Sequence, residues 1–117
     1  MSLKGAHILV VEDDPIIARG ISETLESAGA LVVGPAHNLP KALRLAEDVN
    51  LSAAVLDLRL EVGDTLSVAA RFEERGIQFL FQTSDPRAVL KARPDAIILS
   101  KPVAADALVL ALETLLR

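Results

Sequence analysis

Five short runs of apolar residues recur along the chain, and a stretch with helical periodicity follows each of them. Within a run the apolar residues are contiguous and do not alternate with polar ones. Contiguous apolar positions are typical of parallel strands that are covered on both faces. The predicted strands cover residues 7–11, 31–34, 53–56, 78–81 and 96–99.

The intervening stretches carry signals for helix ends. Asp14 followed by Pro15 predicts an N-cap and a first helical position, and Gly29 predicts where that helix stops. The other predicted helices cover residues 38–49, 65–75, 87–92 and 104–116, and the fourth of the five is short. Repetition of strand and helix predicts an α/β fold with a parallel sheet and helices on both faces.

Composition limits the classes of protein that fit this pattern. The 117 residues are 51% apolar, which suits one compact domain covering 1–117. A net charge of -4 without a basic cluster argues against nucleic acid as a partner. The absence of cysteine excludes disulfides and thiolate sites. No apolar stretch approaches the ~20 residues of a membrane span, and no signal-peptide pattern is present, so we expect no membrane partner and a cytoplasmic location.

Polar residues that could bind a ligand or take part in a reaction follow four of the predicted strands. In an open parallel sheet, ligands bind beyond the carboxyl ends of the strands. Glu12, Asp13 and Asp14 follow the first strand, and Asp57 follows the third. Thr83 and Lys101 stand after the fourth and fifth strands.

Several acids at one edge of a sheet require a cation. Two carboxylates ~4 Å apart repel by about 4 kcal/mol at an effective dielectric of ~20, and Lys101 can offset only one charge. Mg²⁺ prefers oxygen ligands and commonly binds one or two carboxylates together with a phosphate oxygen. Aspartate is also a nucleophile that forms an aspartyl phosphate. The sequence therefore predicts a magnesium-dependent phosphoryl site.

The residues at these positions resemble those of response-regulator receiver domains. The resemblance is carried by residues 8–15 (ILVVEDDP), residues 55–60 (VLDLRL), Thr83 and the pair Lys101-Pro102, in the family's order, and it covers essentially the whole chain. It implies a flavodoxin-like fold with the strand order 2-1-3-4-5. It also implies a cis peptide between Lys101 and Pro102.

The resemblance implies a role for each candidate site residue. Asp57 would accept the phosphoryl group, and Lys101 and Thr83 would contact that group. Asp13, Asp57 and the backbone carbonyl of Arg59 would bind Mg²⁺, and Glu12 would act through water. The donor would be a histidine kinase or phosphotransfer protein, and the chain would be a switch that dephosphorylates itself and not an enzyme.

Three features depart from the common receiver pattern. The loop after Asp57 lacks the usual proline, Ile98 stands where the family has a switch aromatic, and the segment 83–101 is short. The departures resemble a subgroup of single-domain bacterial receivers with Phe-x-Thr at the end of the fourth strand, here residues 81–83. They put the family's usual coupling between hydroxyl and aromatic in doubt.

Competing interpretations of the same residues remain open. The acids of residues 12–14 could be a solvated start of a helix, and Thr83 could be only a turn residue. A magnesium-dependent phosphohydrolase would need a second acid two residues after Asp57, where Arg59 stands. An unphosphorylated pseudo-receiver would act only as a protein-interaction module. His7 and His37 are interpreted as structural or exposed.

The last predicted helix has apolar residues on more than one face. The face that should pack on the sheet carries Ala104, Leu108, Ala111, Leu112 and Leu115. Leu110 points almost the opposite way, and Val109 and Leu116 lie on the flank. With Ile98, Leu110 and Val109 are predicted to form one apolar side of the last strand and helix that binds an output partner or a second copy.

Overall fold

The computed structural model describes residues 3–117, in which strands and helices alternate from beginning to end. The strands are β1 (His7–Val11), β2 (Leu31–Ala36), β3 (Ala53–Asp57), β4 (Gln78–Thr83) and β5 (Ile98–Ser100). The helices are α1 (Pro15–Ser27), α2 (Leu39–Leu45), α3 (Leu66–Arg75), α4 (Pro86–Ala92) and α5 (Ala105–Leu115).

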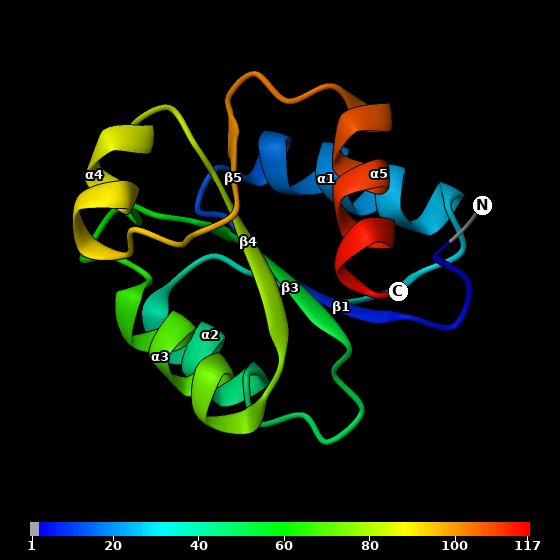
Figure 1. Ribbon diagram of the computed structural model, residues 1–117. Helices are drawn as coiled ribbons and strands as arrows, with labels where there is room; N and C mark the ends of the chain where they lie inside the picture. Colours follow the sequence, from blue (N-terminus) through cyan, green and yellow to red (C-terminus); the bar gives the residue numbers. More distant parts are fainter. Residues whose placement is uncertain (1–2) are drawn as a thin grey trace.

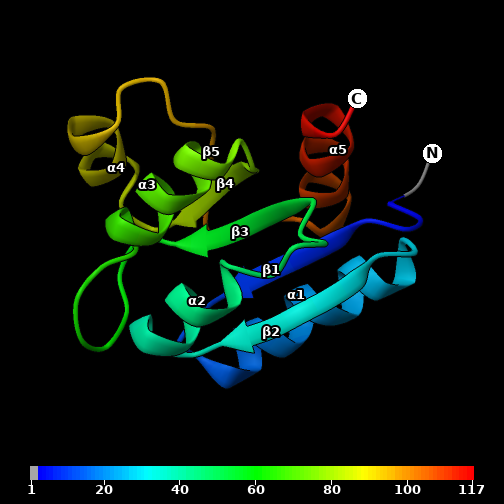
Figure 2. The same ribbon diagram turned by 90° about the horizontal axis from the view of Figure 1, so that it is seen from below.

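The strands form one parallel sheet in the order β2-β1-β3-β4-β5. Helices α1 and α5 lie on one face of the sheet, and α2, α3 and α4 lie on the other (Figures 1 and 2). The flavodoxin-like α/β fold predicted from the sequence is thus confirmed. Among the described residues, no helix is long and apolar enough to cross a membrane.

The contiguous apolar runs are explained by two separate core layers. Leu9 and Leu56 pack toward α2, α3 and α4, whereas Ile8 and Val55 pack toward α1 and α5. Since successive side chains of a strand point to opposite faces, every residue of a central strand meets one of the two layers. All five residues of β3 are buried, so this strand carries its terminal Asp57 on a rigid support.

The edge strand β2 is longer than predicted and contains a break in its pairing with β1. It runs two residues past Gly34, and the register shifts between Leu9 and Val11. The Gly34–Pro35 peptide is cis, and Gly34 has a φ of 92°. Proline is tolerated here because an edge strand leaves one row of amides unpaired.

Helix α2 is shorter than the predicted 38–49, and two apolar residues of the predicted range are exposed. It ends at Leu45, Val49 is 85% exposed and Leu43 is also exposed. The end has a physical cause, because the Arg75 guanidinium donates to the backbone carbonyls of Ala46 and Asp48 beyond the last turn. These carbonyls are satisfied by a side chain from α3 and need no further helical turn.

The predicted apolar side formed by Ile98, Val109 and Leu110 does not exist as one patch. Ile98 packs on the layer beneath α2, α3 and α4, whereas Val109 packs on the opposite layer. Leu110 is 57% exposed and lines a groove beside α1, together with Glu23 and other residues. The sheet thus lies between Ile98 on one face and Val109 and Leu110 on the other, which a helical wheel of α5 alone could not reveal.

The inner face of α5 agrees better with its prediction. Leu108 and Leu112 are buried, and Ala111 and Leu115 pack partly against the same layer, whereas Ala104 is exposed. Strand β5 begins at Ile98, two residues later than predicted, and extends to Ser100. The short α4 predicted near residues 87–92 is formed.

Candidate functional site

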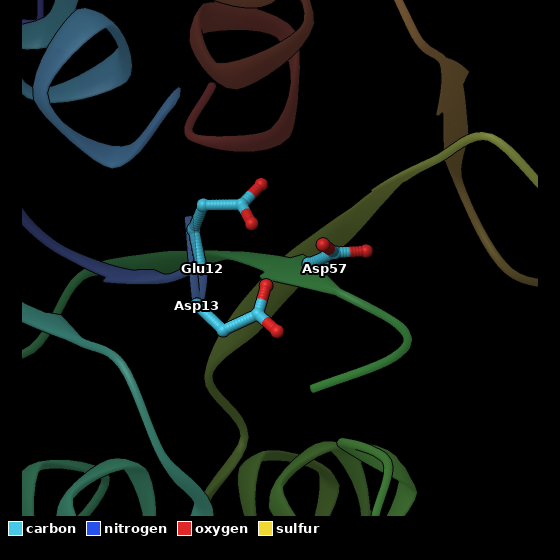
Figure 3. A group of neighbouring side chains, drawn as sticks. All are labelled: Glu12, Asp13 and Asp57. Carbon is cyan, nitrogen blue, oxygen red and sulfur yellow. The ribbon is translucent and has the colours of Figure 1, made fainter. Parts of the chain in front are cut away.

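Three carboxylates meet at the carboxyl edge of the sheet. Glu12 and Asp13 follow β1, and Asp57 is the last residue of β3, the neighbouring strand. One oxygen from each of the three lies within 4.8 Å of the others, and Figure 3 shows the side chains gathered around the same space. The sequence prediction that these acids converge is confirmed.

Lys101 reaches the acids from the end of β5. Its Nζ donates to Glu12 Oε1 at 2.7 Å and to Asp57 Oδ2 at 3.0 Å. Its backbone amide donates to the Thr83 carbonyl, and the following Lys101–Pro102 peptide is cis, as expected from the resemblance. The ammonium therefore bridges acids that come from two different strand ends.

Burial of the site shifts the pKa values of Glu12 and Lys101. Glu12 is 1% exposed, and this burial raises its pKa from 4.5 to about 7. Hydrogen bonds from Lys101 and the Asp14 amide oppose the rise, whereas the charge of Asp57 adds to it. Burial alone would lower the pKa of Lys101, but its hydrogen bonds to Glu12 and Asp57 outweigh this and raise it.

Asp57 is held through its backbone by a buried hydroxyl. Thr65 is fully buried, and its Oγ1 donates to the Asp57 carbonyl at 2.8 Å. The intervening loop closes on itself through a bridge between Arg59 and Asp64. The backbone bonds of this bridge join Leu60 to Gly63 and Thr65 to Leu58, so the bridge does not use the Arg59 carbonyl. That carbonyl is thus not used by the bridge, and it belongs to the residue two positions after Asp57.

The loop that carries Glu12 and Asp13 is fixed from two sides. Asp14 caps α1, as predicted, by accepting from the amides of Ile16 and Ile17. The His37 Nδ1 lies 2.9 Å from the Glu12 carbonyl oxygen, and this contact holds the loop to the segment after β2. His37 is therefore structural, but the sequence pattern gave no sign that its partner would be a residue of the site.

Thr83 is buried at the end of β4, and its hydroxyl already has one partner. The Asp85 amide donates to Thr83 Oγ1 at 2.9 Å. A hydroxyl that accepts one hydrogen bond keeps its own hydrogen for donation, so Thr83 can still donate to an anion. The Asp85 carboxylate in turn accepts from Arg59 at 3.2 Å, a contact that the sequence analysis missed.

The donor set suits a hard divalent cation. All the candidate ligands are oxygens, from three carboxylates and a backbone carbonyl, and magnesium or calcium takes such ligands. Among the described residues, the three carboxylates face a single ammonium, that of Lys101, so the ionised cluster has too little positive charge. A divalent ion would supply that charge, so the residues present fit a metal ion.

The fold and the site lead to a family. A family model described as the response regulator receiver domain matches residues 8–113 of the chain. The chain belongs to this family. Receiver domains are phosphoacceptor switches of two-component signalling and not conventional enzymes, and they generally interact with histidine kinases.

Individual relatives agree with the family match. The chain is 30% identical to the transcriptional regulatory protein GlrR of Escherichia coli, with all of the chain but only 28% of that relative covered. The chain thus spans less than a third of that protein. Its fold matches the solution structure of SdrG from Sphingomonas melonis over the whole of both chains, with 34% identity and a TM-score of 0.83.

Another solved structure is similar to this chain over most of the chain's length. This is a response regulator protein from Burkholderia pseudomallei with a phosphorylated aspartic acid, a calcium ion and citrate. It is 25% identical to the chain, with a TM-score of 0.76, and 96% of the chain and 66% of that protein are covered.

Proposed function

We propose that the chain is a phosphorelay receiver that accepts a phosphoryl group on Asp57 from a histidine kinase or phosphotransfer protein. The observation that carries this proposal is the contact of Lys101 Nζ with both Glu12 and Asp57, 2.7 Å and 3.0 Å away. In this contact the Asp57 carboxylate, the proposed nucleophile, lies beside an ammonium that can neutralise the incoming anion. The phosphorylated aspartic acid of the Burkholderia relative supports the same chemistry.

In the proposed transfer, an Asp57 carboxylate oxygen forms a bond to phosphorus while the bond from phosphorus to the donor breaks. The leaving imidazole of a phosphohistidine, or the leaving carboxylate of an acyl phosphate, keeps the electron pair. Lys101 moves from the carboxylates onto the phosphoryl oxygens, and the Thr83 hydroxyl donates its hydrogen to one of these oxygens. Attack of water on the same phosphorus later returns Asp57 to its free state.

The proposed cofactor is Mg²⁺, held by Asp13, Asp57 and the Arg59 backbone carbonyl, with Glu12 acting through water. When bound, it neutralises the acids and the phosphoryl oxygens and so lets one anion approach another. The Burkholderia relative was solved with a calcium ion as well as a phosphorylated aspartic acid, which supports a divalent ion as the cofactor. We expect Asp57 to be unreactive toward phosphodonors once EDTA has removed divalent ions.

Incubation with acetyl phosphate and Mg²⁺, followed by intact mass measurement, tests the proposal. The wild-type chain should gain one phosphoryl group, and Asp57→Asn should gain none. Asp64→Asn removes an exposed acid of the following loop and serves as the matched control that should still label. A wild-type chain that never labels would favour the pseudo-receiver, in which the domain only binds partners.

The output partner, or a second copy of the chain, is proposed to bind through the last strand and the last helix. What supports this is the exposed Leu110, which lines a groove beside α1 together with the partly buried Val109, whereas the partly buried Ile98 packs on the other face of the sheet. Leu110→Lys should weaken any self-association seen by analytical ultracentrifugation and leave Asp57 labelling unchanged. Unaltered association in this variant would exclude Leu110 from the interface.

A further inference from the structure

A cavity lies on the face of the sheet that α1 and α5 cover. Its volume is about 530 Å³, and it is partly open to the surface. Its walls are mostly apolar: Ile17 and Ile21 come from α1, Leu108 comes from α5, and Pro102 and Val103 come from the segment between β5 and α5. Sites for small molecules commonly have volumes of roughly 300–1,000 Å³ and combine apolar walls with a few polar groups.

Gln82 contributes a buried polar group to this cavity. It stands on β4 two positions after Leu80, which packs in the layer beneath α1 and α5, so the Gln82 side chain points to the same face. The residue is 2% exposed, and its Nε2 has no hydrogen-bond partner among the described residues. A buried amide without a partner costs free energy, and most such groups in folded proteins are paired. The cavity therefore offers a hydrogen-bond donor that no described residue uses.

The charges around the cavity favour an uncharged ligand. Of the described residues that line it, only Lys101 is charged. The Lys101 ammonium already donates to Glu12 and Asp57, so an anion would find no unused positive charge and would lie near two carboxylates. A cation would find no carboxylate in the lining. Burial of either charge without a partner would be costly.

We infer that this cavity binds a small uncharged molecule with an apolar body and a carbonyl oxygen, and that the carbonyl oxygen accepts a hydrogen bond from Gln82 Nε2. The hydrogen bond satisfies the buried donor. The apolar body covers side chains such as Ile17, which is 39% exposed, and removes them from water. The inference goes beyond the proposed function and does not depend on it, because it requires neither phosphorylation of Asp57 nor a metal ion.

Titration of the whole, isotope-labelled chain with cyclohexyl methyl ketone, followed by NMR, tests the inference. The ketone should shift the side-chain amide signals of Gln82 and the backbone amide signals of Gly20 and Ala105, which also line the cavity. The shifts should saturate with a dissociation constant on the order of 1 mM, as expected for so small a ligand. Cyclohexanecarboxylate and 1-cyclohexylethylammonium have nearly the same shape but carry a charge, and each should bind at least about fivefold more weakly.

Gln82→Met tests the hydrogen bond, because it keeps an unbranched side chain of similar size and removes the donor. It should bind the ketone about fivefold more weakly, which corresponds to the loss of one hydrogen bond. Without ligand it should unfold at a higher urea concentration than wild type, since it no longer buries an unpaired amide. A lower urea midpoint would show that the amide is already satisfied in the folded protein, and would contradict the inference.

Gly20→Leu tests the location of the ligand. A Cβ at Gly20 would have open space around it, so a leucine can enter the cavity without a backbone clash. This variant should bind the ketone about fivefold more weakly or worse, because the side chain occupies the space of the ligand. Glu26→Leu is the matched control, since it places the same side chain at an exposed position of α1 outside the cavity, and it should bind as wild type does.

Three results would contradict the inference. If the ketone causes no saturable shift of the Gln82 side chain, the cavity holds only water. If Gln82→Met binds the ketone as tightly as wild type, Nε2 is not the donor. If cyclohexanecarboxylate or 1-cyclohexylethylammonium binds as tightly as the ketone, the cavity does not select an uncharged ligand.

Discussion

The centre of the sheet and its β5 edge differ sharply in how they are packed. Strand β3 is buried along its whole length and ends in Asp57, whereas β5 has three residues, none of them fully buried. Helix α4, next to β5, buries only Val89 (Figure 1). The acids therefore follow the buried central strands, whereas β5 and α4 bury fewer side chains and are expected to open locally at a lower free energy.

The largest effect is expected from truncating one apolar side chain in each of the two regions. Leu56→Ala in β3 should lower the free energy of unfolding by about 3 kcal/mol, because it leaves a cavity between fully packed layers. Leu99→Ala in β5, where the side chain is only half-buried, should cost about 1 kcal/mol. Urea denaturation followed by circular dichroism measures both. Equal losses would show that the β5 edge is as tightly packed as the centre.

In the opposite edge strand, β2, substitution of Gly34 should destabilise the fold more than Leu99→Ala does in β5. At Gly34, with a φ of +92°, a Cβ would lie 2.8 Å from the Ala36 nitrogen. We expect Gly34→Ala to cost about 2 kcal/mol or more in urea denaturation, because backbone atoms must shift. Gly63→Ala is the matched control, since Gly63 also has a positive φ but has open space around it. It should cost about 1 kcal/mol, and a similar loss in both variants would exclude the backbone clash as the cause.

Lys101 joins the two regions, and its removal should affect them differently. Lys101→Ala removes a positive charge that competes with a metal ion for Glu12 and Asp57, so Mg²⁺ should bind as tightly as in wild type or more tightly. The conformational change on phosphorylation should weaken. Calorimetric titration with Mg²⁺ measures the first effect, with the exposed Lys91→Ala as control. Weaker Mg²⁺ binding in Lys101→Ala would contradict this account of the charge balance.

The smallest expected effect concerns a surface link that holds α3 to the segment after α2. The hydrogen bond from Arg71 lowers the pKa of Glu47 below its usual value. A lowered pKa stabilises the fold above the ordinary pKa of glutamate, and the stabilisation is lost as the pH falls through the folded-state value. Glu47→Gln should therefore unfold at slightly lower urea concentration at pH 7, and the difference from wild type should vanish in acid. A difference that persists or grows in acid would assign the effect to something other than this charge.

The sequence was sufficient for the parts of the molecule that depend on local pattern and topology. Parallel strands place their carboxyl ends together, so Glu12, Asp13 and Asp57 could be expected to meet before any contact was known. The contacts of Asp85, His37 and Thr65 could not be expected. Each depends on where a loop side chain turns after the strands have been placed, and no periodicity reports this.

Long-range packing explains the other errors. The end of α2 is set by Arg75, which reaches back from α3, and a pattern read along one helix does not contain that residue. The same limit applies to Ile98 and Leu110. Both are apolar and near the end of the chain, but they lie on opposite faces of the sheet.

Chemical trapping of the labelled residue tests the central claim most directly. After incubation with acetyl phosphate and Mg²⁺, borohydride should reduce an aspartyl phosphate to homoserine, which peptide mass spectrometry can locate. The account predicts homoserine at position 57, dependent on Mg²⁺ and abolished when EDTA is present before the phosphodonor. Homoserine at position 13, the reduced glutamate (2-amino-5-hydroxypentanoic acid) at position 12, or labelling that does not need a divalent ion, would contradict the assignment of Asp57 as the phosphoryl acceptor.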